Sequence, residues 1–377
     1  MASQPGTTPF RFYDNRQKYL AFVNTCNEKQ KVADRAAEEL RDIRPTPPAL
    51  RLFDAGMGDA TVLARLMRSA HATWPAVPQL VVAKEISRED VRLGLEKMAD
   101  RFLEHPTTVL VITNLHYADA PALRPGNPDD LSRLNWQVLR LRGDSSHEYA
   151  RQIDGLEGVL DYGWATRPSE TSGNPVYSRP SVLVIFREDH AFLLDGVIPR
   201  QETPAPDYDF ILASQPWRAR MSAQFKVGKV LLPLVRRLGA GGRLLVIQSR
   251  GDDPGLEIVR ALWPGESPFQ VDRHKLLAEL KTALGTDAAL YSLPDPPDSE
   301  SLFRYEMHTL PAEVSDRIGT SMLFAAWNAA IYVNQIEDER LGEVVETGRY
   351  LDATRAVLRK HGGLWFNDES FVVSRRA

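Results

Sequence analysis

The residues of this chain whose types and spacing most strongly suggest chemistry are two glycines and two acids within six positions. Asp54, Gly56, Gly58 and Asp59 form an Asp-x-Gly-x-Gly pattern between an apolar run and a helical pattern that begins at Ala60. Glycine lets the backbone turn tightly and leaves room for a ligand, and the first turn of a helix has free N–H groups. The pattern therefore predicts a strand, a glycine turn and a helix that bind a nucleotide-type ligand.

The third position of the glycine pattern separates two kinds of nucleotide. A dinucleotide site needs a third glycine so that the pyrophosphate can reach the helix N-terminus, but Thr61 stands there. Glu85 ends the next strand-like run, where an acid can bind a ribose diol. Asp54 and Asp59 add negative charge, which suits a cationic, amine-bearing ligand better than a pyrophosphate. These residues favour S-adenosylmethionine over NAD.

The elements that must position these residues follow from alternating patterns along the chain. Apolar strand-like runs occur at 50–54, 80–85, 108–113, 207–215 and 243–248, separated by helical patterns. This alternation predicts an α/β, doubly wound and mostly parallel, seven-stranded Rossmann-like sheet. Ligands bind at the carboxyl ends of such strands, so the crevice should contain the following residues: Asp54 to Gly58, Glu85, Asn114, and Ser214 to Trp217.

Three segments lie outside this alternation. Residues 1–48 are expected to form a helical cap on the α/β domain 49–377, with helices at 15–22 and 28–40. Tyr19 and the other aromatic residues of the cap either pack against the domain or cover the ligand. Residues 120–206 are expected to be an inserted element with strands at 136–141, 182–186 and 192–198 and a helix at 146–155.

The remaining predictions concern the connecting helices and the C-terminal part. Helices are expected at 88–103, 219–238 and 272–284, and the glycines at 239–242 are expected to end the second of these. Short strands are expected at 290–292 and 303–307. A helical elaboration covers about 312–361, and residues 362–376 are read as a hairpin whose last strand closes the sheet.

Composition limits the class of protein. The chain has 377 residues, 43% of them hydrophobic, which allows one large domain with insertions or two ordinary ones. A net charge of -4 with mixed signs gives no indication of nucleic-acid binding, and no apolar stretch reaches the length of a membrane span. The N-terminus has no secretory pattern, and the single Cys26 permits no internal disulfide, so the expected location is the cytoplasm.

The glycine turn, the acid of the second strand and the later strand that ends in Ser214 and Gln215 resemble the first motifs of class I methyltransferases. This resemblance names the cofactor as S-adenosyl-L-methionine. It implies that the cofactor is bound by the following residues: Asp54, Gly56, Gly58, Asp59, Glu85, Asn114 and Ser214.

Separated segments further resemble the histamine N-methyltransferase-like family of small-molecule methyltransferases. Residues 18–30 resemble its opening helix, in which a Glu contacts the substrate amine, and residues 144–149 resemble its segment near the adenine. Residues 365–367 resemble the segment before its final strand. The resemblance implies N-methylation of a small nitrogen-containing metabolite, with Glu28, Gln215 and Asn367 around the amine and Ser145 near the adenine.

Methyl transfer requires little covalent chemistry from these residues. Methyl transfer from a sulfonium is an in-line displacement, so the protein chiefly aligns a lone pair with the methyl group. A protonated amine must first lose a proton, which Glu28 can take while Gln215 and Asn367 orient the nitrogen. Tyr19, Trp217 and His116 are further candidates for substrate contact. If these residues have only structural roles, Glu28 complements a helix dipole, Asn367 is a turn residue and His116 is a loop histidine with its hydrogen bonds satisfied.

Several alternatives stay open at this point. An O-methyltransferase would use His116 or His190 as a base, and a peptide or protein methyltransferase would dock its substrate on the insertion. A non-catalytic S-adenosylmethionine-binding module is also compatible with the motifs. No metal is expected, because His190 and His308 have no matching ligands nearby in the sequence. The expected partner is a small molecule, without nucleic acid or membrane, and the methyl acceptor, the number of methyl groups and the oligomeric state are left open.

Overall fold

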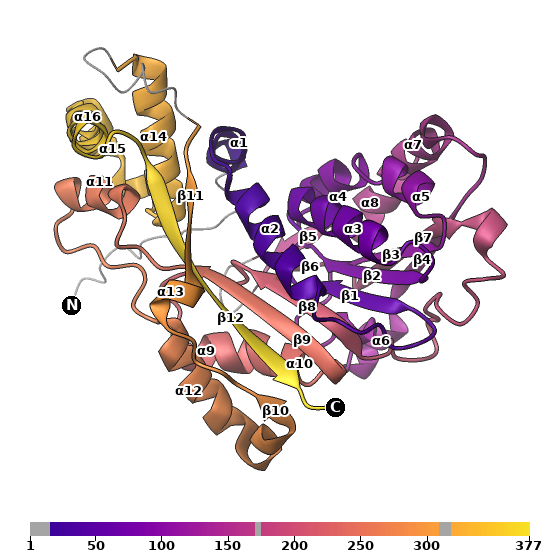
Figure 1. The fold of residues 1–377 in the computed structure, drawn as a ribbon. Coiled ribbons are helices and arrows are strands. Elements are labelled where there is room, and N and C mark those ends of the chain that lie inside the picture. Colours follow the sequence, from indigo (N-terminus) through magenta and orange to yellow (C-terminus); the bar gives the residue numbers. More distant parts are fainter. Residues whose placement is uncertain (1–15, 170–174, 309–317) are drawn as a thin grey trace.

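One mostly parallel sheet forms the centre of the computed structural model, which describes residues 16–169, 175–308 and 318–377 (Figure 1). Within these residues the sheet has ten strands, in the order β10-β12-β9-β8-β1-β2-β3-β7-β4, with β11 paired to β12. The strands are β1 Leu50–Asp54, β2 Gln79–Lys84, β3 Thr108–Thr113, β4 Asn135–Leu141, β7 Ser181–Arg187, β8 Tyr208–Ser214, β9 Leu238–Ser249, β10 Tyr291–Ser292, β11 Leu302–Glu306 and β12 Trp365–Arg375. A separate two-stranded sheet pairs β5, Thr166–Pro168, with β6, Pro175–Tyr177.

The order of the strands confirms the predicted doubly wound fold. From β1 the chain proceeds to β2 and β3 on one side, and later to β8 and β9 on the other, all five strands being parallel. The order therefore reverses between β1 and β8, and a crevice opens beyond their carboxyl ends. The predicted number of seven strands is too low, because β4, β7 and β11 also join the sheet and bring it to ten strands within the described residues.

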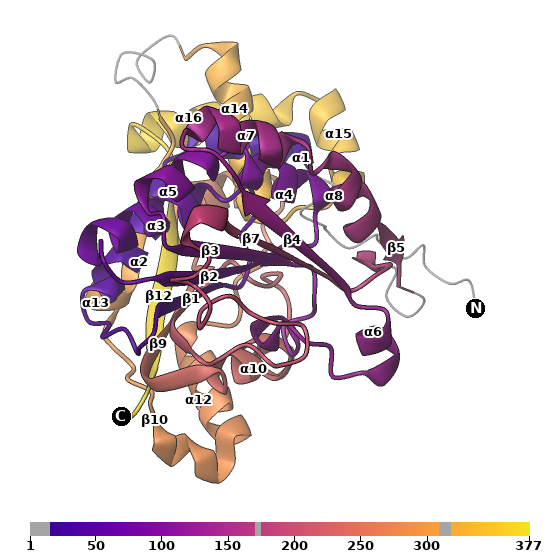
Figure 2. The same cartoon turned by 90° about the vertical axis from the view of Figure 1, so that its right-hand side faces the viewer.

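Helices cover both faces of the sheet (Figures 1 and 2). One face is covered by α2 Glu28–Leu40, α3 Thr61–Thr73, α4 Arg88–Leu95, α5 Ala99–Glu104, α7 Ser146–Asp154 and α8 Glu157–Gly163. The other face is covered by α6 Pro128–Ser132, α9 Ala223–Lys226, the π-helical turn Val227–Leu231, α10 Leu232–Val235 and α12 Arg273–Leu284. Side chains alternate along each strand, so Leu52 of β1 packs into the first layer and Phe53 into the second.

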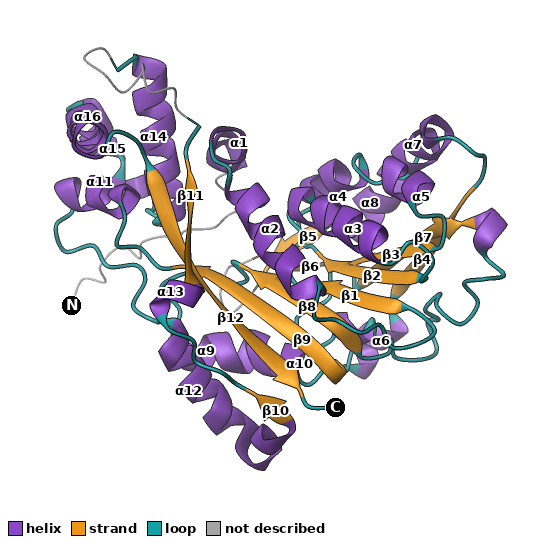
Figure 3. Ribbon diagram, in the orientation of Figure 1, coloured by secondary structure: helices purple, strands orange, loops and turns teal. Residues whose placement is uncertain are grey.

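A third hydrophobic layer lies at the carboxyl end of the central strands. It joins α1 Arg16–Thr25 with α11 Pro254–Leu262, α14 Thr320–Val333, α15 Gly342–Glu346 and α16 Arg349–His361, while α13 Asp298–Ser301 lies beside β12 (Figure 3). Within this layer the rings of Phe22 and Tyr332 are 5.1 Å apart. The N-terminal cap thus meets the C-terminal helices above the crevice. No described helix is both long enough and apolar enough to cross a membrane.

The structure corrects the prediction for part of the insertion. β4, β7 and α7 form as expected, but β4 and β7 join the main sheet, and the predicted strand at 192–198 consists of turns. Phe192 is 93% exposed, whereas Leu194 and Val197 are buried three positions apart. This spacing is that of successive turns rather than the two-residue alternation of a strand. Helix α8 and the small sheet of β5 and β6 were not predicted.

The glycines at 239–242 also have a different role from the one predicted. They lie inside β9, opposite a shift in register between Tyr208 and Phe210, and do not end a helix. A Cβ on Gly242 would lie 2.5 Å from the carbonyl oxygen of Tyr208, so only glycine fits there. The preceding helix begins at Ala223, four residues later than expected, and ends at Val235.

Three other expected elements differ in continuity. The helix predicted at 88–103 is broken into α4 and α5, and the C-terminal helix is broken at Gly348, whose φ is 70°. Residues 365–375 form the single strand β12 instead of a hairpin, paired with β9, β10 and β11. Residues 309–317 of the predicted helical elaboration, and Phe10, Phe12 and Tyr13 of the cap, lie outside the described residues.

Candidate functional site

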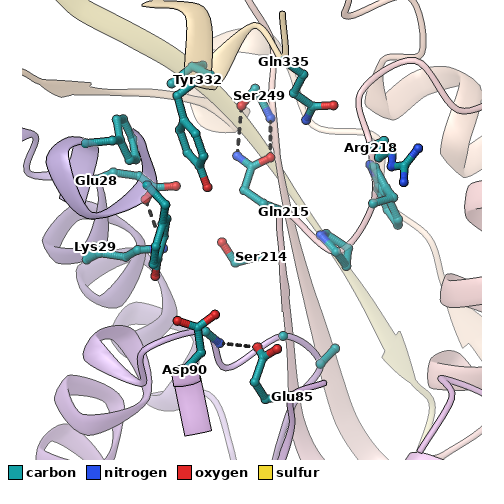
Figure 4. Close-up of a pocket in the computed structure, with 18 of the residues that line it drawn as sticks. Glu28, Lys29, Glu85, Asp90, Ser214, Gln215, Arg218, Ser249, Tyr332 and Gln335 are labelled. Carbon is teal, nitrogen blue, oxygen red and sulfur yellow. Dashed lines mark hydrogen bonds and ion pairs between the residues drawn. The ribbon is translucent and has the colours of Figure 1, made fainter. Parts of the chain in front are cut away.

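A pocket of about 390 Å³ opens at the point where the strand order reverses. Its walls come from the carboxyl ends of β1, β2 and β8 and from α1, α2 and α14 above them (Figure 4). Figure 4 shows Glu28 and Lys29 on one side of the pocket and Arg218 on the other, with Ser214 and Gln215 between them. The residues that line it are Tyr19, Phe22, Glu28, Lys29, Ala55, Gly56, Gly58, Lys84, Glu85, Ile86, Asp90, Tyr117, Ser214, Gln215, Pro216, Trp217, Arg218, Ser249, Tyr305, Tyr332, Val333 and Gln335.

The glycine turn forms one edge of the pocket, as the sequence predicted for Gly56 and Gly58. Asp54 is buried beneath the turn, where its Oδ1 accepts a hydrogen bond from the Gly56 N–H at 3.0 Å. Burial raises the pKa of Asp54 to about 6. Asp54 therefore supports the turn from below and does not line the pocket.

Glu85 is the acid of the pocket at the end of β2. Its Oε1 accepts from the N–H groups of Ile86 and Ser87, both at 2.8 Å, and its Oε2 accepts from the N–H of Gly58 at 2.9 Å. Burial and the charge of Asp90 raise the pKa of Glu85, and these N–H groups oppose that effect. Three backbone donors thus fix the direction of the carboxylate and tie β2 to the glycine turn.

The inserted element reaches this side of the pocket indirectly. The ring N–H of Trp164 donates to the backbone carbonyl of Glu85 at 2.8 Å, and the Trp164 side chain is buried. Next to Glu85, the Lys84 amine lies 4.6 Å from the centre of the Tyr117 ring, whose hydroxyl donates to the carbonyl of Pro216 at 3.0 Å. Burial lowers the pKa of Lys84.

Asp59 holds the cap on the turn. The Tyr19 hydroxyl donates to Asp59 Oδ1 at 3.2 Å, and the Thr61 hydroxyl donates to Asp59 Oδ2 at 2.6 Å. Lys97 lies 3.4 Å from the same carboxylate, and the Thr61 hydrogen bond and Lys97 keep the pKa of Asp59 below its usual value although burial opposes them. Asp59 therefore fixes the start of α3 and the position of α1, while Tyr19 itself lines the pocket.

A buried carboxylate faces the pocket from the first turn of α2. Glu28 is 5% exposed, and its Oε2 lies 3.3 Å from the Lys29 amine but has no hydrogen-bond partner among the described residues. Burial would lower the pKa of Lys29, but the adjacent Glu28 carboxylate holds it well above its ordinary value. This wall consequently carries an ion pair.

Aromatic rings surround the ion pair. Phe22 packs against Tyr332 and, edge to face, against Tyr305 at 5.9 Å. Burial raises the pKa of both tyrosines well above its ordinary value, so both hydroxyls stay protonated. The faces of such rings attract cations and flat apolar groups.

Gln215 leaves β8 at the centre of the pocket in a strained backbone conformation, with φ at 49°. Its Oε1 accepts from the Ser249 N–H at 3.2 Å, and its Nε2 donates to the Ser249 hydroxyl at 3.1 Å and to Asp368 Oδ1 at 3.2 Å. Trp217 lines the pocket two residues later, where its ring N–H donates to Gln248 Oε1 at 3.0 Å. Of the residues predicted around the acceptor, Glu28, Gln215, Tyr19 and Trp217 line this pocket.

Asn367, the third residue predicted to orient the acceptor, lies outside this pocket. Its Nδ2 donates to the carbonyls of Gly251 and Asp252 at 3.2 and 2.9 Å, so it holds the loop before α11. Asp368, the next residue of β12, is turned the other way and bonds to Gln215. Adjacent residues of a strand point to opposite faces, which is why a shift of one position separates the two roles.

Asn114 and Ser145 also lie away from the pocket. Asn114 is buried and joins Gly163, Arg179 and Ser181 through its side-chain amide. Ser145 is the N-cap of α7, accepting from the Glu148 N–H at 3.3 Å. It follows β4, which runs antiparallel to β3, so the strand carries it to the edge of the sheet opposite the pocket.

The histidine candidates are displaced for similar reasons. His116 follows β3 but its ring packs on Tyr177 at 4.7 Å, outside the pocket. His190 follows β7, which is antiparallel to β3, and it lies 3.0 Å from Asp189 at the opposite edge of the sheet. Neither histidine is therefore placed to act as a base in this pocket.

Sequence reasoning missed several residues that line the pocket or support it, among them Lys29, Lys84, Tyr305, Tyr332 and Asp368. Lys29 and Lys84 each stand beside a predicted acid, and that adjacency was an available signal. Tyr332 lies in an apolar helix more than 300 residues from Tyr19, and nothing in its local sequence distinguishes it from a core residue.

Comparison with known proteins gives structural likeness only. No protein-family model and no curated protein sequence matches this chain. The [4+2]-cyclase SpnF is 12% identical to this chain, with a TM-score of 0.34. The match covers 91% of this chain and 81% of the SpnF chain. A SAM-dependent methyltransferase from Thiobacillus denitrificans in complex with S-adenosyl-L-homocysteine is 11% identical, with a TM-score of 0.34 and coverage of 92% and 91%.

Geranyl diphosphate methyltransferase in complex with GPP and sinefungin is 9% identical to this chain, with a TM-score of 0.34. The match covers 91% of this chain and 76% of the geranyl diphosphate methyltransferase chain. At these values the matches carry no argument about activity. The topology of the sheet and the composition of the pocket are what indicate a function.

Proposed function

We propose that this chain is an S-adenosylmethionine-dependent methyltransferase whose acceptor is a small nitrogen-containing molecule. One observation carries the proposal. The same pocket joins a glycine turn and a fixed acid at the carboxyl ends of β1 and β2 to a buried carboxylate and aromatic rings contributed by the cap. The glycine turn and the fixed acid suit a nucleoside, and the buried carboxylate and aromatic rings suit a small cation or amine.

The residues at the strand ends fit the proposed cofactor. A Cβ at Gly56 would meet only the Ser214 carbonyl, at 3.9 Å, so the backbone is open to a ligand there. Glu85 Oε2 has one backbone donor and is free on its other side to accept from a ribose hydroxyl. When bound, the cofactor supplies an electrophilic methyl group, and the chain's own task is to hold an acceptor lone pair in line with it.

The opposite wall fits a nitrogen acceptor. Glu28 Oε2 lies 3.3 Å from the Lys29 amine but has no hydrogen-bond partner among the described residues, so an N–H of the acceptor can donate to it. A carboxylate at that position can also take the proton that an ammonium must lose before its nitrogen attacks. Phe22, Tyr305 and Tyr332 supply ring faces against which the acceptor packs.

Two alternatives have less support in this geometry. Methylation of a hydroxyl through His116 or His190 lacks its base, because both side chains lie outside the pocket. A peptide acceptor would need a broad groove, whereas a cavity of about 390 Å³ falls in the range of small-molecule sites. The loop after β7, which belongs to the insertion, lies at the opposite edge of the sheet and does not cover the pocket.

The test is calorimetric titration of the full chain with S-adenosylmethionine, S-adenosylhomocysteine and NAD. We expect the first two to bind and NAD not to bind. Glu38→Ala, which removes a mostly exposed carboxylate from α2, is the matched control for Glu85→Ala. Binding followed by methyl transfer from labelled cofactor to members of a panel of small amines would support the proposal. Binding of NAD alone would overturn it.

A further inference from the structure

The side chain of Gln215 has almost no free hydrogen-bonding capacity. An amide has two N–H hydrogens and two oxygen lone pairs. Both hydrogens of Nε2 are engaged, one by the Ser249 hydroxyl and one by Asp368 Oδ1, and Oε1 already accepts from the Ser249 N–H. Because a backbone N–H can only donate, Oε1 is identified as the oxygen. One lone pair of Oε1 is left, on a side chain that lines the pocket.

The burial of the Asp368 carboxyl group is energetically unfavourable. It is 0% exposed, and its Oδ2 has no hydrogen-bond partner among the described residues. Burial and the nearby Glu28 and Asp253 raise its pKa well above the ordinary value, against the opposing effect of Ser249 and Gln215. A buried carboxyl with an unsatisfied oxygen destabilises a fold, and packing alone gives no reason for it.

The backbone of Gln215 is a second departure from minimum energy at the same place. Its φ of 49° lies in the left-handed region, and its N–H is held by the carbonyl of Ile247 at 2.9 Å. Left-handed backbone at a non-glycine residue is unfavourable and persists only where the surroundings hold it. The buried Asp368 carboxyl and the left-handed backbone of Gln215 are thus two unfavourable features that both fix the direction of the Gln215 amide.

We propose that Asp368 is a positioning residue that acts through Gln215, by engaging the second N–H of its amide so that Gln215 offers the pocket an acceptor and no donor. This inference rests on the proposed function and deepens it. The methyl acceptor must then present an N–H or O–H to Gln215 Oε1. A carboxylate acceptor is disfavoured, because its oxygens would meet Oε1 and the Glu28 carboxylate with no hydrogen between them.

Two probes of equal charge and equal ring test the polarity of the site. Benzylammonium carries three N–H donors, and benzyltrimethylammonium carries none. Their dissociation constants are measured by calorimetry on the full chain saturated with S-adenosylhomocysteine. We expect the wild type to bind benzylammonium at least tenfold more tightly than benzyltrimethylammonium, because only benzylammonium can donate a hydrogen bond to Gln215 Oε1.

The variants separate a positioning role from a structural one. Asp368→Leu removes the carboxyl at similar volume, and we expect it to reduce the preference for benzylammonium about fivefold or more while leaving the midpoint of thermal unfolding unchanged or higher. Asp368→Asn keeps an oxygen for Nε2 and should retain the preference. Asp368→Ala makes the same binding prediction as Asp368→Leu, should the larger side chain not be accommodated.

A double-mutant cycle shows whether Asp368 acts through Gln215. In a Gln215→Leu background, adding Asp368→Leu should change the preference no further. An unchanged preference in Asp368→Leu, an additive effect in the cycle, or no binding of benzylammonium to the S-adenosylhomocysteine-loaded protein would overturn the inference. Failure of S-adenosylhomocysteine itself to bind would instead overturn the proposed function, so the two failures are distinguishable.

Discussion

Gly58 lies directly beneath the hydroxyl of Tyr19. A Cβ added to Gly58 would be 3.2 Å from Tyr19 Oη, and the backbone of Gly58 has a φ of 53°. The glycine is therefore required twice, once by its own turn and once by the cap helix that closes over it. This close approach brings α1 against the first βα turn, where Gly58 and Tyr19 both line the pocket.

We expect Gly58→Ala to lower the free energy of unfolding by roughly 1–2 kcal/mol, because a side chain at positive φ is strained and Tyr19 must also move. Urea unfolding measures the loss. Gly228→Ala is the control, since nothing lies within 4 Å of its Cβ position and it is helical; it should leave the protein as stable or slightly more so. Equal effects in the two variants would contradict the role of Gly58.

Glu85→Gln keeps the shape of the side chain but replaces one oxygen by a donor that faces backbone N–H groups. We expect it to weaken S-adenosylhomocysteine binding tenfold or more, because charge-assisted hydrogen bonds to Glu85 contribute about 1.5–3 kcal/mol. Calorimetric titration measures the change, with Glu38→Gln on α2 as the control. An unchanged dissociation constant would show that the ribose does not bind this acid.

Glu28→Gln tests the other half of the pocket. The substitution removes the carboxylate while keeping an oxygen near Lys29, so benzylammonium should bind about tenfold more weakly to the protein loaded with S-adenosylhomocysteine. The affinity for S-adenosylhomocysteine itself should change less than twofold. If both ligands lose affinity equally, Glu28 supports the fold of the cap and does not bind the acceptor.

The raised pKa of Asp54 predicts an unusual dependence of the free energy of unfolding on pH. Its pKa is about 6 in the folded chain against an ordinary value of 3.8, so the folded state binds the proton more tightly than the unfolded state. Its contribution to stability is present in full below pH 4 and is lost as the pH rises towards 6. Relative to Asp54→Asn, the wild type should lose up to about 3 kcal/mol of unfolding free energy between pH 4 and pH 7.

Urea unfolding of the two proteins at pH 4, 5, 6 and 7 measures that difference. Asn retains an oxygen for the Gly56 N–H, so the comparison isolates the charge. A constant difference across the four pH values would mean that Asp54 does not titrate in this range.

Much of the central architecture was readable from local pattern. Runs of buried apolar residues predicted β1, β2, β3 and β8 to within a residue or so, because a strand covered on both faces must be apolar throughout. The glycine spacing placed the turn, and the rule that ligands bind at the carboxyl ends of parallel strands placed Gly58, Glu85, Ser214 and Gln215 around one crevice. Each strand and turn was recognised from residues that are close together in the sequence, and the rule for parallel sheets then brought their ends together.

What the sequence could not decide depends on contacts between distant segments. The direction of β7 is set by its antiparallel pairing with β3, and that of β4 by its parallel pairing with β7. These directions place Ser145 and His190 at the far edge of the sheet. The choice between Asn367 and Asp368 is one step of strand alternation, fixed only when β12 pairs with β9. Tyr332 reaches the pocket because α14 packs on α1. The amino-acid sequence thus determined the central strands and the glycine-turn side of the pocket. Tertiary packing determined which side chains form the opposite wall, because the direction of a side chain depends on how its strand or helix pairs with distant elements.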